Sequence, residues 1–549
     1  MNNFRFLACV SAVVLFGQVS FAAEQPDAGQ TLQNLHKSPT LPAASPNVSF
    51  DAPVSNVHKA GGPQVTVRSI TITGNDVIAD DVLLPLLDDA QGQSFDLAGM
   101  KGLADRITVY YHNHDYPFAR AFIPTQSMKG DVLNITVVEG RYGNIETQGD
   151  DARAGATPKF LTRLGHESVI EGRALERVSL ILDDQPGYRF MPVIRPGQDM
   201  GTGDLSFRME REERFGGNVR IDNQGNRYTG RVRGQLGLYA NSPFMFGDQI
   251  NINTVYTEEQ MWFGSIGYNA PIGGSGLRGN VGYAHTDYEL GKQFSSLDAH
   301  GTAKVVSAGL SYPIIRSQKA NLSLSVNYQH KWLTDEQGSS SSVDKKSSDV
   351  VPVALNFDAR DGFFGGGVTY GMFSITHGIL DLDSGLAATD ATTAQSKGSF
   401  NKVNLDVARL QALPIDNFTF FGRMAGQLAG DNLDSSEDFG LGGPSGARAY
   451  PVGESYGDEG ALGQAELRYQ VGHVAPYVFY DYGHTRTNDD PWTTGDNDRS
   501  IGGAGIGMRA AYKGWNADMS AAWRTVGGDP KSDDRDTMPM VWLGLGYTF

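Results

Sequence analysis

The chain ends with the segment MVWLGLGYTF, residues 540–549, in which side chains of two kinds alternate. In an extended strand the two faces would carry Val541, Leu543, Leu545, Tyr547 and Phe549 on one side and Trp542, Gly544, Gly546 and Thr548 on the other. One continuously apolar face is typical of a transmembrane β-barrel, whose strands alternate between lipid and lumen. The segment therefore predicts the last strand of such a barrel.

The region before this strand shows the same strand-like pattern. From residue 214 onward helical periodicity disappears, and sixteen strand-like segments follow one another, QININTVYT (249–257) and VAPYVFYDYGHT (474–485) among them. Short turns such as 271–273 contrast with long polar stretches at 334–349 and 381–399, which we expect to be loops. Barrel strands are joined in this alternating way. We predict a transmembrane antiparallel β-barrel of about sixteen strands over residues 214–549, with Phe549 as its assembly signal for the barrel-assembly machinery.

Composition narrows the class further. Beyond the N-terminus no run of 18 apolar residues occurs, which excludes a helical membrane protein. The formal net charge of −17 argues against nucleic acid as a partner, because phosphate binding requires clustered Lys and Arg. The single cysteine, Cys9, lies near the N-terminus, so the rest of the chain has neither a disulfide nor a thiolate-bound metal.

The N-terminal residues read as an export signal and a linker. Residues 1–22 combine Arg5, an apolar stretch and a small-residue cleavage site, which predicts a signal peptide. Residues 23–63 are rich in Pro, Ala and Ser and predict a short helix followed by a flexible linker.

Two small α/β units are expected between the linker and the barrel. Residues 64–140 show a strand at VTVRSITIT, two helical pieces and two further strands, in the order β-α-α-β-β. Residues 141–213 repeat this order more loosely, with turns marked by Pro186-Gly187 and Pro196-Gly197.

These features together resemble the two-partner secretion transporters of the hemolysin secretion/activation (ShlB/FhaC/HecB) family. The first unit is similar to a polypeptide-transport-associated (POTRA) domain in VTVRSITITGN, YPFARAFIPTQ and LNITVVEGRYG, and the second resembles the family's other POTRA domain. The most specific likeness lies in GLGGPSGARAYPVGESYGDEG, residues 440–460. It follows the family's sixth extracellular loop, whose pattern is Leu-Gly-Gly-Pro, Val-Arg-Gly-Tyr and Gly-Asp-x-Gly.

The resemblance implies that this loop folds back into the lumen and that its arginine pairs with the aspartate of a Phe-x-Asp motif on the wall. The pair would be Arg448 and Asp481, with Phe479 completing the wall motif. A guanidinium and a carboxylate can form two charge-assisted bonds, so the residue types suit such an anchor. Supporting loop positions are Ala447, Ala449, Tyr450, Gly457, Asp458 and Gly460. Ala447 and Ala449 depart from the family's Val and Gly, and Ala tolerates positive φ poorly.

Two patterns invite a catalytic or metal-binding interpretation. Gly453 to Gly457 fits the G-x-S-x-G nucleophile elbow around Ser455, and Asp481 and His484 follow it, but the next segment lacks a helical period. His112 and His114 form an H-x-H pair that we interpret as turn residues. No phosphate-binding G-x-x-x-x-G-K-[ST] motif is present. We expect no catalytic residues, no metal and no cofactor, and therefore no enzyme.

By resemblance we expect a translocator in the outer membrane of a Gram-negative bacterium, with its POTRA domains in the periplasm. Its partners would be outer-membrane lipid and a large exoprotein, of adhesin or hemolysin type, with an N-terminal secretion domain. Residues 24–38 would be the family's pore-plugging helix. The alternatives are a barrel-assembly-type insertase and, less well supported, a passive porin or a surface hydrolase.

Overall fold

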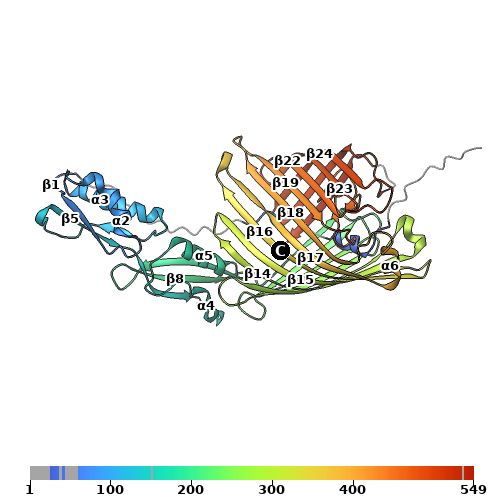
Figure 1. Ribbon diagram of the computed structural model, residues 1–549, viewed down its shortest axis with the longest axis horizontal. Coiled ribbons are helices and arrows are strands. Elements are labelled where there is room, and N and C mark those ends of the chain that lie inside the picture. Colours follow the sequence, from blue (N-terminus) through green and yellow to red (C-terminus); the bar gives the residue numbers. More distant parts are fainter. Residues whose placement is uncertain (1–24, 36–39, 44–59, 150–151, 534–536) are drawn as a thin grey trace, which may run out of the picture.

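The computed structural model describes residues 25–35, 40–43, 60–149, 152–533 and 537–549. The expected signal peptide, residues 1–22, lies outside the described residues. Two small α/β units extend from one end of a large barrel, and helix α6 (Ser384–Asp390) lies at the opposite end (Figure 1). None of the described helices is both long enough and apolar enough to cross a bilayer.

The barrel is closed and antiparallel, which confirms the predicted fold class. Each strand pairs with the next along the chain, and β26 closes the ring on β9 through Gly544↔Asp222 to Thr548↔Asn218. Its sixteen strands are β9 (Phe215–Asp222), β10 (Arg233–Asn241), β11 (Gln249–Thr257), β12 (Trp262–Pro271), β13 (Arg278–Glu289), β14 (Ala299–Arg316), β15 (Ala320–Gln337), β16 (Ser342–Asp361), β17 (Gly367–Leu382), β18 (Gly398–Ala412), β19 (Phe418–Ala429), β22 (Glu459–Tyr469), β23 (Val474–Arg486), β24 (Asp498–Tyr512), β25 (Trp515–Val526) and β26 (Met540–Thr548).

The period of two divides the side chains as the terminal segment predicts. In β26, Val541, Leu543 and Leu545 are exposed on the outer face, while Trp542 is buried. The terminal Phe549 is also exposed, and its backbone forms two hydrogen bonds with Gly217 at the start of β9, each of 2.9 Å. The outer face therefore presents the apolar surface that lipid requires.

The polar stretch 334–349 is not a loop, so this expectation was wrong. Strand β15 continues to Gln337 and β16 begins at Ser342, and the two residues pair directly. A barrel strand that extends beyond the bilayer has no lipid to face, so it can be polar on both faces and still satisfy its backbone in the ladder. The stretch 381–399, by contrast, leaves the sheet and carries α6.

The first α/β unit has a three-stranded sheet in the order β2 (Ser69–Thr73), β5 (Val132–Val138), β4 (Arg120–Phe122). Strand β2 is parallel to β5 and β4 is antiparallel to it. The helices are α2 (Asp80–Leu83), η1 (Leu84–Ala90) and α3 (Leu97–Asn113), with β1 (Val65–Thr66), β3 (Ser94–Phe95) and η2 (Lys129–Asp131) at the margins. Asp96 caps α3 by accepting from the Gly99 amide at 2.7 Å, and this bond lowers the pKa of Asp96.

The second unit repeats the topology with the sheet order β6 (Arg141–Gln148), β8 (Thr202–Arg211), β7 (Tyr188–Pro196). Its helices are η3 (Ala152–Ala156), α4 (Pro158–Leu161) and α5 (Gly172–Asp183). The two units have separate cores, one around Leu103, Ile107 and Tyr111 and the other around Leu175, Tyr188 and Phe207.

The second unit is bound to the rim of the barrel. The end of α5 presents Asp184, which accepts hydrogen bonds from Arg316 Nε at 2.7 Å and Nη2 at 2.6 Å. Arg177 of the same helix donates to the carbonyl of Pro313 at 2.5 Å and to that of Ile314 at 3.1 Å. Contacts of these two arginines therefore fix α5 against the end of β14.

Glycines on the inner face of β24 make room for larger side chains. A Cβ atom at Gly505 would lie 2.3 Å from the Phe479 ring, and one at Gly507 would lie 2.2 Å from the Tyr477 ring. At Gly463 on β22, by contrast, the nearest atom would be 3.9 Å from an added Cβ. Only the first two positions therefore need glycine for space.

We expect Gly505→Ala to destabilise the barrel by about 1–3 kcal/mol, because the methyl group overpacks the wall against Phe479. The matched substitution Gly463→Ala should stay within about 0.5 kcal/mol of the parent. Urea unfolding of the purified protein in detergent, followed by tryptophan fluorescence, measures both. Equal stability of the two variants would contradict the packing role assigned to the glycines.

Candidate functional site in the barrel lumen

The segment between β19 and β22 folds back into the barrel. It leaves the wall through the short pair β20 (Phe439–Gly440) and β21 (Tyr456–Gly457), in which Phe439 pairs with Gly457 and Gly440 with Tyr456. Leu441, Ala447 and Tyr450 are fully buried within the loop. A loop rich in glycine can make these tight reversals, as at Gly443, where φ is +85°.

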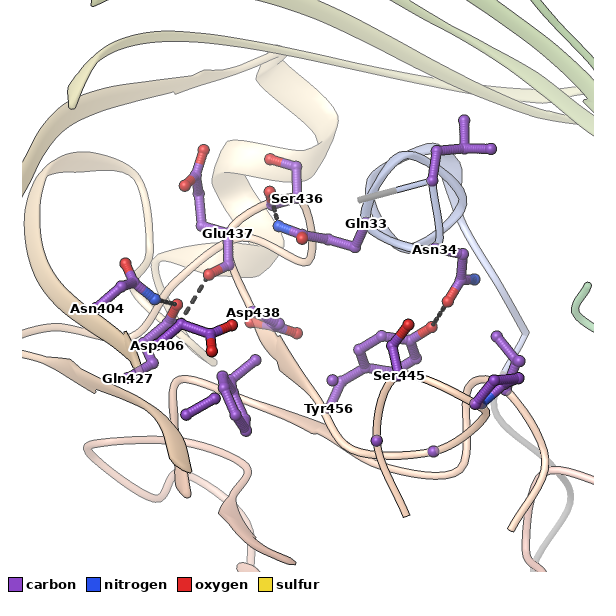
Figure 2. Close-up of a pocket in the computed structure, with 18 of the residues that line it drawn as sticks. Gln33, Asn34, Asn404, Asp406, Gln427, Ser436, Glu437, Asp438, Ser445 and Tyr456 are labelled. Atoms are coloured by element: carbon purple, nitrogen blue, oxygen red, sulfur yellow. Dashed lines mark hydrogen bonds between the residues drawn. The ribbon is translucent and has the colours of Figure 1, made fainter. Parts of the chain in front are cut away.

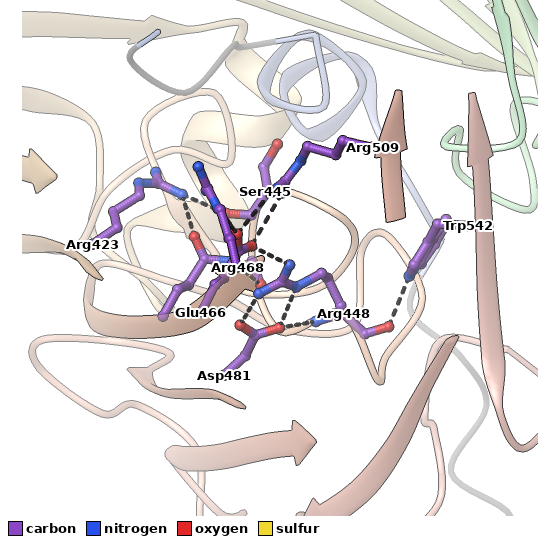
Figure 3. A network of polar contacts seen from close by, with 10 residues as sticks. Arg423, Ser445, Arg448, Glu466, Arg468, Asp481, Arg509 and Trp542 are labelled. Atoms are coloured by element: carbon purple, nitrogen blue, oxygen red, sulfur yellow. Dashed lines mark hydrogen bonds and ion pairs between the residues drawn. The ribbon is translucent and has the colours of Figure 1, made fainter. Parts of the chain in front are cut away.

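The tip of the loop is held by Arg448. Its Nε and Nη2 atoms donate to the two oxygens of Asp481, each at 2.7 Å, and its backbone amide donates to Asp481 Oδ2 at 3.1 Å (Figure 3). Asp481 lies on β23 and is fully buried, and Arg448 is 4% exposed. The two residues that the family resemblance pairs are thus in bidentate contact, the strongest geometry available to these side chains.

Neighbouring groups fix the orientation of the arginine. The guanidinium lies 3.6 Å from the centroid of the Phe479 ring, two residues before Asp481 on the same face of β23. The Trp542 indole on β26 donates to the Arg448 carbonyl at 2.8 Å. Tyr450 donates toward the carbonyls of Val526 at 2.6 Å and Gly528 at 2.8 Å. The loop tip is therefore held against one part of the barrel wall, from β23 to β26.

Sequence reasoning missed three residues of this network, Glu466, Arg468 and Arg509. Arg448 Nη1 also donates to Glu466 Oε1 at 2.5 Å, and Glu466 pairs with Arg468 at 2.7 Å and with Arg509 at 2.8 Å (Figure 3). Glu466 is 3% exposed. The alternation along β22 could have found two of them, because Glu466 and Arg468 follow Gln464 at a spacing of two and so share its inward-facing side of the strand.

The two alanines that depart from the family pattern fit without strain. Ala449 is buried and is absent from the residues with positive φ, so the conformation that would demand glycine does not arise. Its methyl group lies against Gly503 of β24, where a Cβ atom would come within 2.2 Å of it. Ala447 donates its amide to the Leu441 carbonyl at 2.6 Å. A glycine on the wall therefore provides the space that Ala449 takes on the loop.

Asp458 ties the base of the loop together. Its carboxylate accepts from the amide of Leu433 at 2.9 Å and from that of Asp489 at 2.8 Å. Its neighbours Gly457 and Gly460 lie where a Cβ atom would meet Arg486 O at 2.2 Å and the Phe439 ring at 2.4 Å. The Gly-Asp-x-Gly motif therefore joins the two ends of the loop through the hydrogen bond from the Leu433 amide and the packing of Gly460 on Phe439. The bond from the Asp489 amide and the closely packed Gly457 hold it against the connection after β23.

A short helix occupies the lumen beside the loop. Helix α1 (Ala28–Gln33) is capped by Asp27 and lies within residues 24–38, the segment that the resemblance assigned to the plug. The Asp27 carboxylate contacts Lys346 of β16 at 2.9 Å, and Lys346 in turn contacts Asp434 at 2.8 Å. Apolar contacts come from Leu32 and Leu35, which pack on the wall near Tyr228 and Met261. The short blue stretch inside the barrel in Figure 1 is this helix.

The helix also contacts the in-folded loop and the segment that leads into it. Tyr456 donates to the Asn34 side chain at 2.7 Å, and Gln33 donates to the Ser436 carbonyl (Figure 2). Between these elements remains a cavity of about 690 Å³, whose lining includes the polar side chains of Asn404, Asp406, Gln427 and Asp438. The lumen therefore contains the in-folded loop, α1 and a water-accessible cavity between them.

The candidate nucleophile elbow does not assemble. The Ser455 hydroxyl lies 2.6 Å from that of Thr485, and strand β22 follows the turn in place of a helix. Asp481 faces Arg448, and His484 lies 3.0 Å from Ser500 Oγ on the neighbouring strand. Ser455, His484 and Asp481 therefore do not form the relay that a hydrolase needs.

The histidine pair is likewise used within the fold. His112 Nε2 lies 2.9 Å from the Ala119 carbonyl, and His114 Nδ1 lies 2.7 Å from that of Tyr110. Within the described residues, no group of three or more His, Cys, Asp or Glu side chains is placed to hold a metal ion.

Fold and site together define a class: an outer-membrane β-barrel that carries a loop anchored in its lumen and is preceded by tandem POTRA units. The profile of the haemolysin secretion/activation protein ShlB/FhaC/HecB family matches residues 201–510, and that of the ShlB-type POTRA domain matches residues 65–140. The chain belongs to this family of two-partner secretion transporters, and its POTRA domains lie in the periplasm.

Individual relatives agree with this assignment. The heme/hemopexin transporter protein HuxB of Haemophilus influenzae is 29% identical over 501 residues, covering 87% of each chain. The structure of CdiB from Escherichia coli superposes with a TM-score of 0.72 at 20% identity, over 91% of this chain and 94% of that one. The structure of CdiB from Acinetobacter baumannii superposes with a TM-score of 0.63 at 16% identity, over 94% of this chain and 95% of that one. The two structural matches establish the fold alone.

We expect Arg448→Gln to destabilise the barrel by about 3–5 kcal/mol, because it leaves the carboxylate of Asp481 buried without its cation. The control is Arg486→Gln on β23, since Arg486 is partly exposed and its contacts with Glu459 and Asp489 are both long, at 3.4 Å. Arg486→Gln should lower the free energy of unfolding by at most about 1 kcal/mol. Urea unfolding compares the two, and a smaller loss for Arg448→Gln than for Arg486→Gln would contradict a buried anchor.

Proposed function

We propose that the chain exports one large secreted exoprotein, which its POTRA units capture in extended form and pass through the lumen. The observation that carries this proposal is the content of the lumen. The loop tip and α1 are held by ionic and polar contacts together with two apolar clusters of modest size, and the ionic and polar contacts can be exchanged for water or cargo. We propose no enzymatic activity for the chain.

Capture in extended form needs a strand edge with unpaired backbone groups. The edge of β4 does not offer one. Its outward amide at Ala121 donates to Thr108 Oγ1 at 2.9 Å, and the Ala119 carbonyl is occupied by His112. Both caps come from α3, so this helix closes the edge of the first sheet.

The edge of β7 in the second unit is closed by other means. Pro192 and Pro196 have no amide hydrogen to donate. The outward amide of Phe190 donates to Asp183 Oδ1 at 2.9 Å, and that of Tyr188 donates to the Gln185 carbonyl at 3.3 Å. Proline and capped amides on an edge are devices that prevent strand addition.

The edge of β2 in the first unit is open along its length. Arg68 donates to Asp131 O at 2.8 Å on the β5 side, so by alternation Ser69, Thr71 and Thr73 direct their amides and carbonyls outward. Within the described residues no backbone or side-chain partner covers these groups. In the second unit, the start of β6 is covered, since Tyr142 exchanges bonds with Ser168 and Glu167. We propose β2 as the edge to which a cargo strand adds.

Helix α1 is proposed as the plug of the resting pore. It lies in the lumen beside the loop, and its contacts with Lys346 and with the segment 434–436 are ionic or polar. Export through the lumen requires that the helix leave, and these contacts can be replaced by water as it does so.

The export function is tested by expressing a candidate partner, such as a large exoprotein encoded by a neighbouring gene, in a bacterium with and without this chain. Exoprotein that reaches the surface or the medium only when the chain is present supports the proposal. Unchanged exoprotein, together with depletion of other outer-membrane barrels when the chain is absent, would replace it with the insertase alternative.

The β2 edge gives a sharper prediction. Thr71→Pro removes one outward amide without breaking the ladder to β5, so the unit should fold while cargo binding weakens. Thr71→Val keeps the amide and should bind cargo like the parent. We expect secretion to fall several-fold for proline alone, measured as exoprotein in the medium at equal barrel levels. Equal secretion by both variants would exclude this edge.

A further inference from the structure

The turn that follows α3 carries a residue with no role in either site. His112 of α3 and His114 of this turn form hydrogen bonds within the first unit, whereas the Asp115 carboxylate bonds to the second unit.

Helix α5 of the second unit begins without a cap of its own. The residue at its N-cap position, Glu171, makes no side-chain hydrogen bond to the helix. Both carboxylate oxygens of Asp115 instead accept from the Arg173 amide, each at 3.0 Å, and the Asp115 carbonyl accepts from the Gly172 amide at 2.9 Å. The first unit therefore supplies the cap of a helix in the second, where a carboxylate also meets the positive end of the helix dipole.

The local backbone places this carboxylate closely. Asp115 adopts a left-handed conformation with φ of 77°, which Asp and Asn tolerate better than most residues do. Gly172 allows the approach, because a Cβ atom there would lie 2.7 Å from Asp115 Oδ1. An alanine in place of Gly172 would push the cap away.

Other contacts stiffen the same joint. Phe118 packs against the core of the second unit, and a Cβ atom at Gly140, between the units, would lie 2.7 Å from Phe118 Cβ. Arg141 of β6 reaches back to Asp76 of the first unit at 2.7 Å. The interface is therefore a packed one, with the Asp115 cap at one side.

We infer that Asp115 is a positioning residue that locks the two POTRA units into one rigid body by capping α5 across their interface. Because Asp184 and Arg177 fix α5 to the barrel rim, the lock holds the first unit in one orientation relative to the pore. The contact between the two units does not depend on whether the chain carries cargo. Its consequence for export rests on the proposed function, in which the β2 edge must face the pore entrance.

The lock is tested by pulsed electron spin resonance on the full chain in detergent. Spin labels at Lys101→Cys on α3 and Glu210→Cys on β8 report the distance between the units, and Cys9, in the expected signal peptide, is the only native cysteine. Asp115→Gly removes the carboxylate without straining the positive φ, whereas Asp115→Asn keeps one acceptor oxygen and tolerates the same backbone.

We expect the parent and Asp115→Asn to give one narrow distance distribution and Asp115→Gly to give a broad one. Loss of such a cap raises the undocked population by roughly 2- to 30-fold. A distribution for Asp115→Gly that is as narrow as the parent's would overturn the lock. Secretion measured in parallel separates the two proposals: a broad distribution with undiminished export would keep the lock and remove its link to the proposed cargo edge.

Discussion

The in-folded loop and α1 have little apolar surface to pack on, because the apolar outer faces of the strands are turned to lipid and the inner faces are largely polar. The apolar clusters inside the barrel, one around Tyr450 and Phe479 and one around Tyr228 and Met261, are smaller than the cores of the POTRA units. Charged contacts that are shielded from bulk water meet that constraint. Arg448 bonds Asp481 at the tip of the loop, and Lys346 joins Asp27 of α1 to Asp434. Buried pairs of this kind add little net stability but strongly disfavour partial disruption, so they specify one arrangement of the lumen.

These contacts form one connected path through the lumen. The loop tip is fixed by Arg448, its base is fixed by Asp458, and the segment before the base binds α1 through Ser435 and Ser436. Gly29 of the helix lies so close to this segment that a Cβ atom there would meet Ser435 Oγ at 2.3 Å. Helix α1 therefore rests on the loop region as well as on the wall, so displacing one of them breaks contacts of the other.

Much of the barrel could be predicted from the sequence, because the barrel itself imposes an alternation of apolar and polar side chains on the parts of its strands that face lipid. The Arg448 and Asp481 positions followed from motif likeness. The partners Glu466 and Arg509 did not, since which inward charges meet depends on the register and curvature of three strands. The polar hairpin at 334–349 was misjudged because it lies in β15 and β16 without needing an apolar face. The helix cap provided by Asp115 could not be predicted, because Asp115 lies in the first unit and helix α5 in the second, and no local sequence pattern connects them.

The central claim is that the lumen is the export path and that α1 obstructs it until it is displaced. A disulfide between Asp27→Cys, at the N-cap of α1, and Ser435→Cys would tie the helix to the loop segment, because the parent side chains are in hydrogen-bond contact at 2.5 Å and Cys9 is the only native cysteine. Exoprotein secretion by this variant should stop under oxidation and return on reduction, with the barrel assembled in both states. Secretion at the parent rate from fully cross-linked protein would contradict the account.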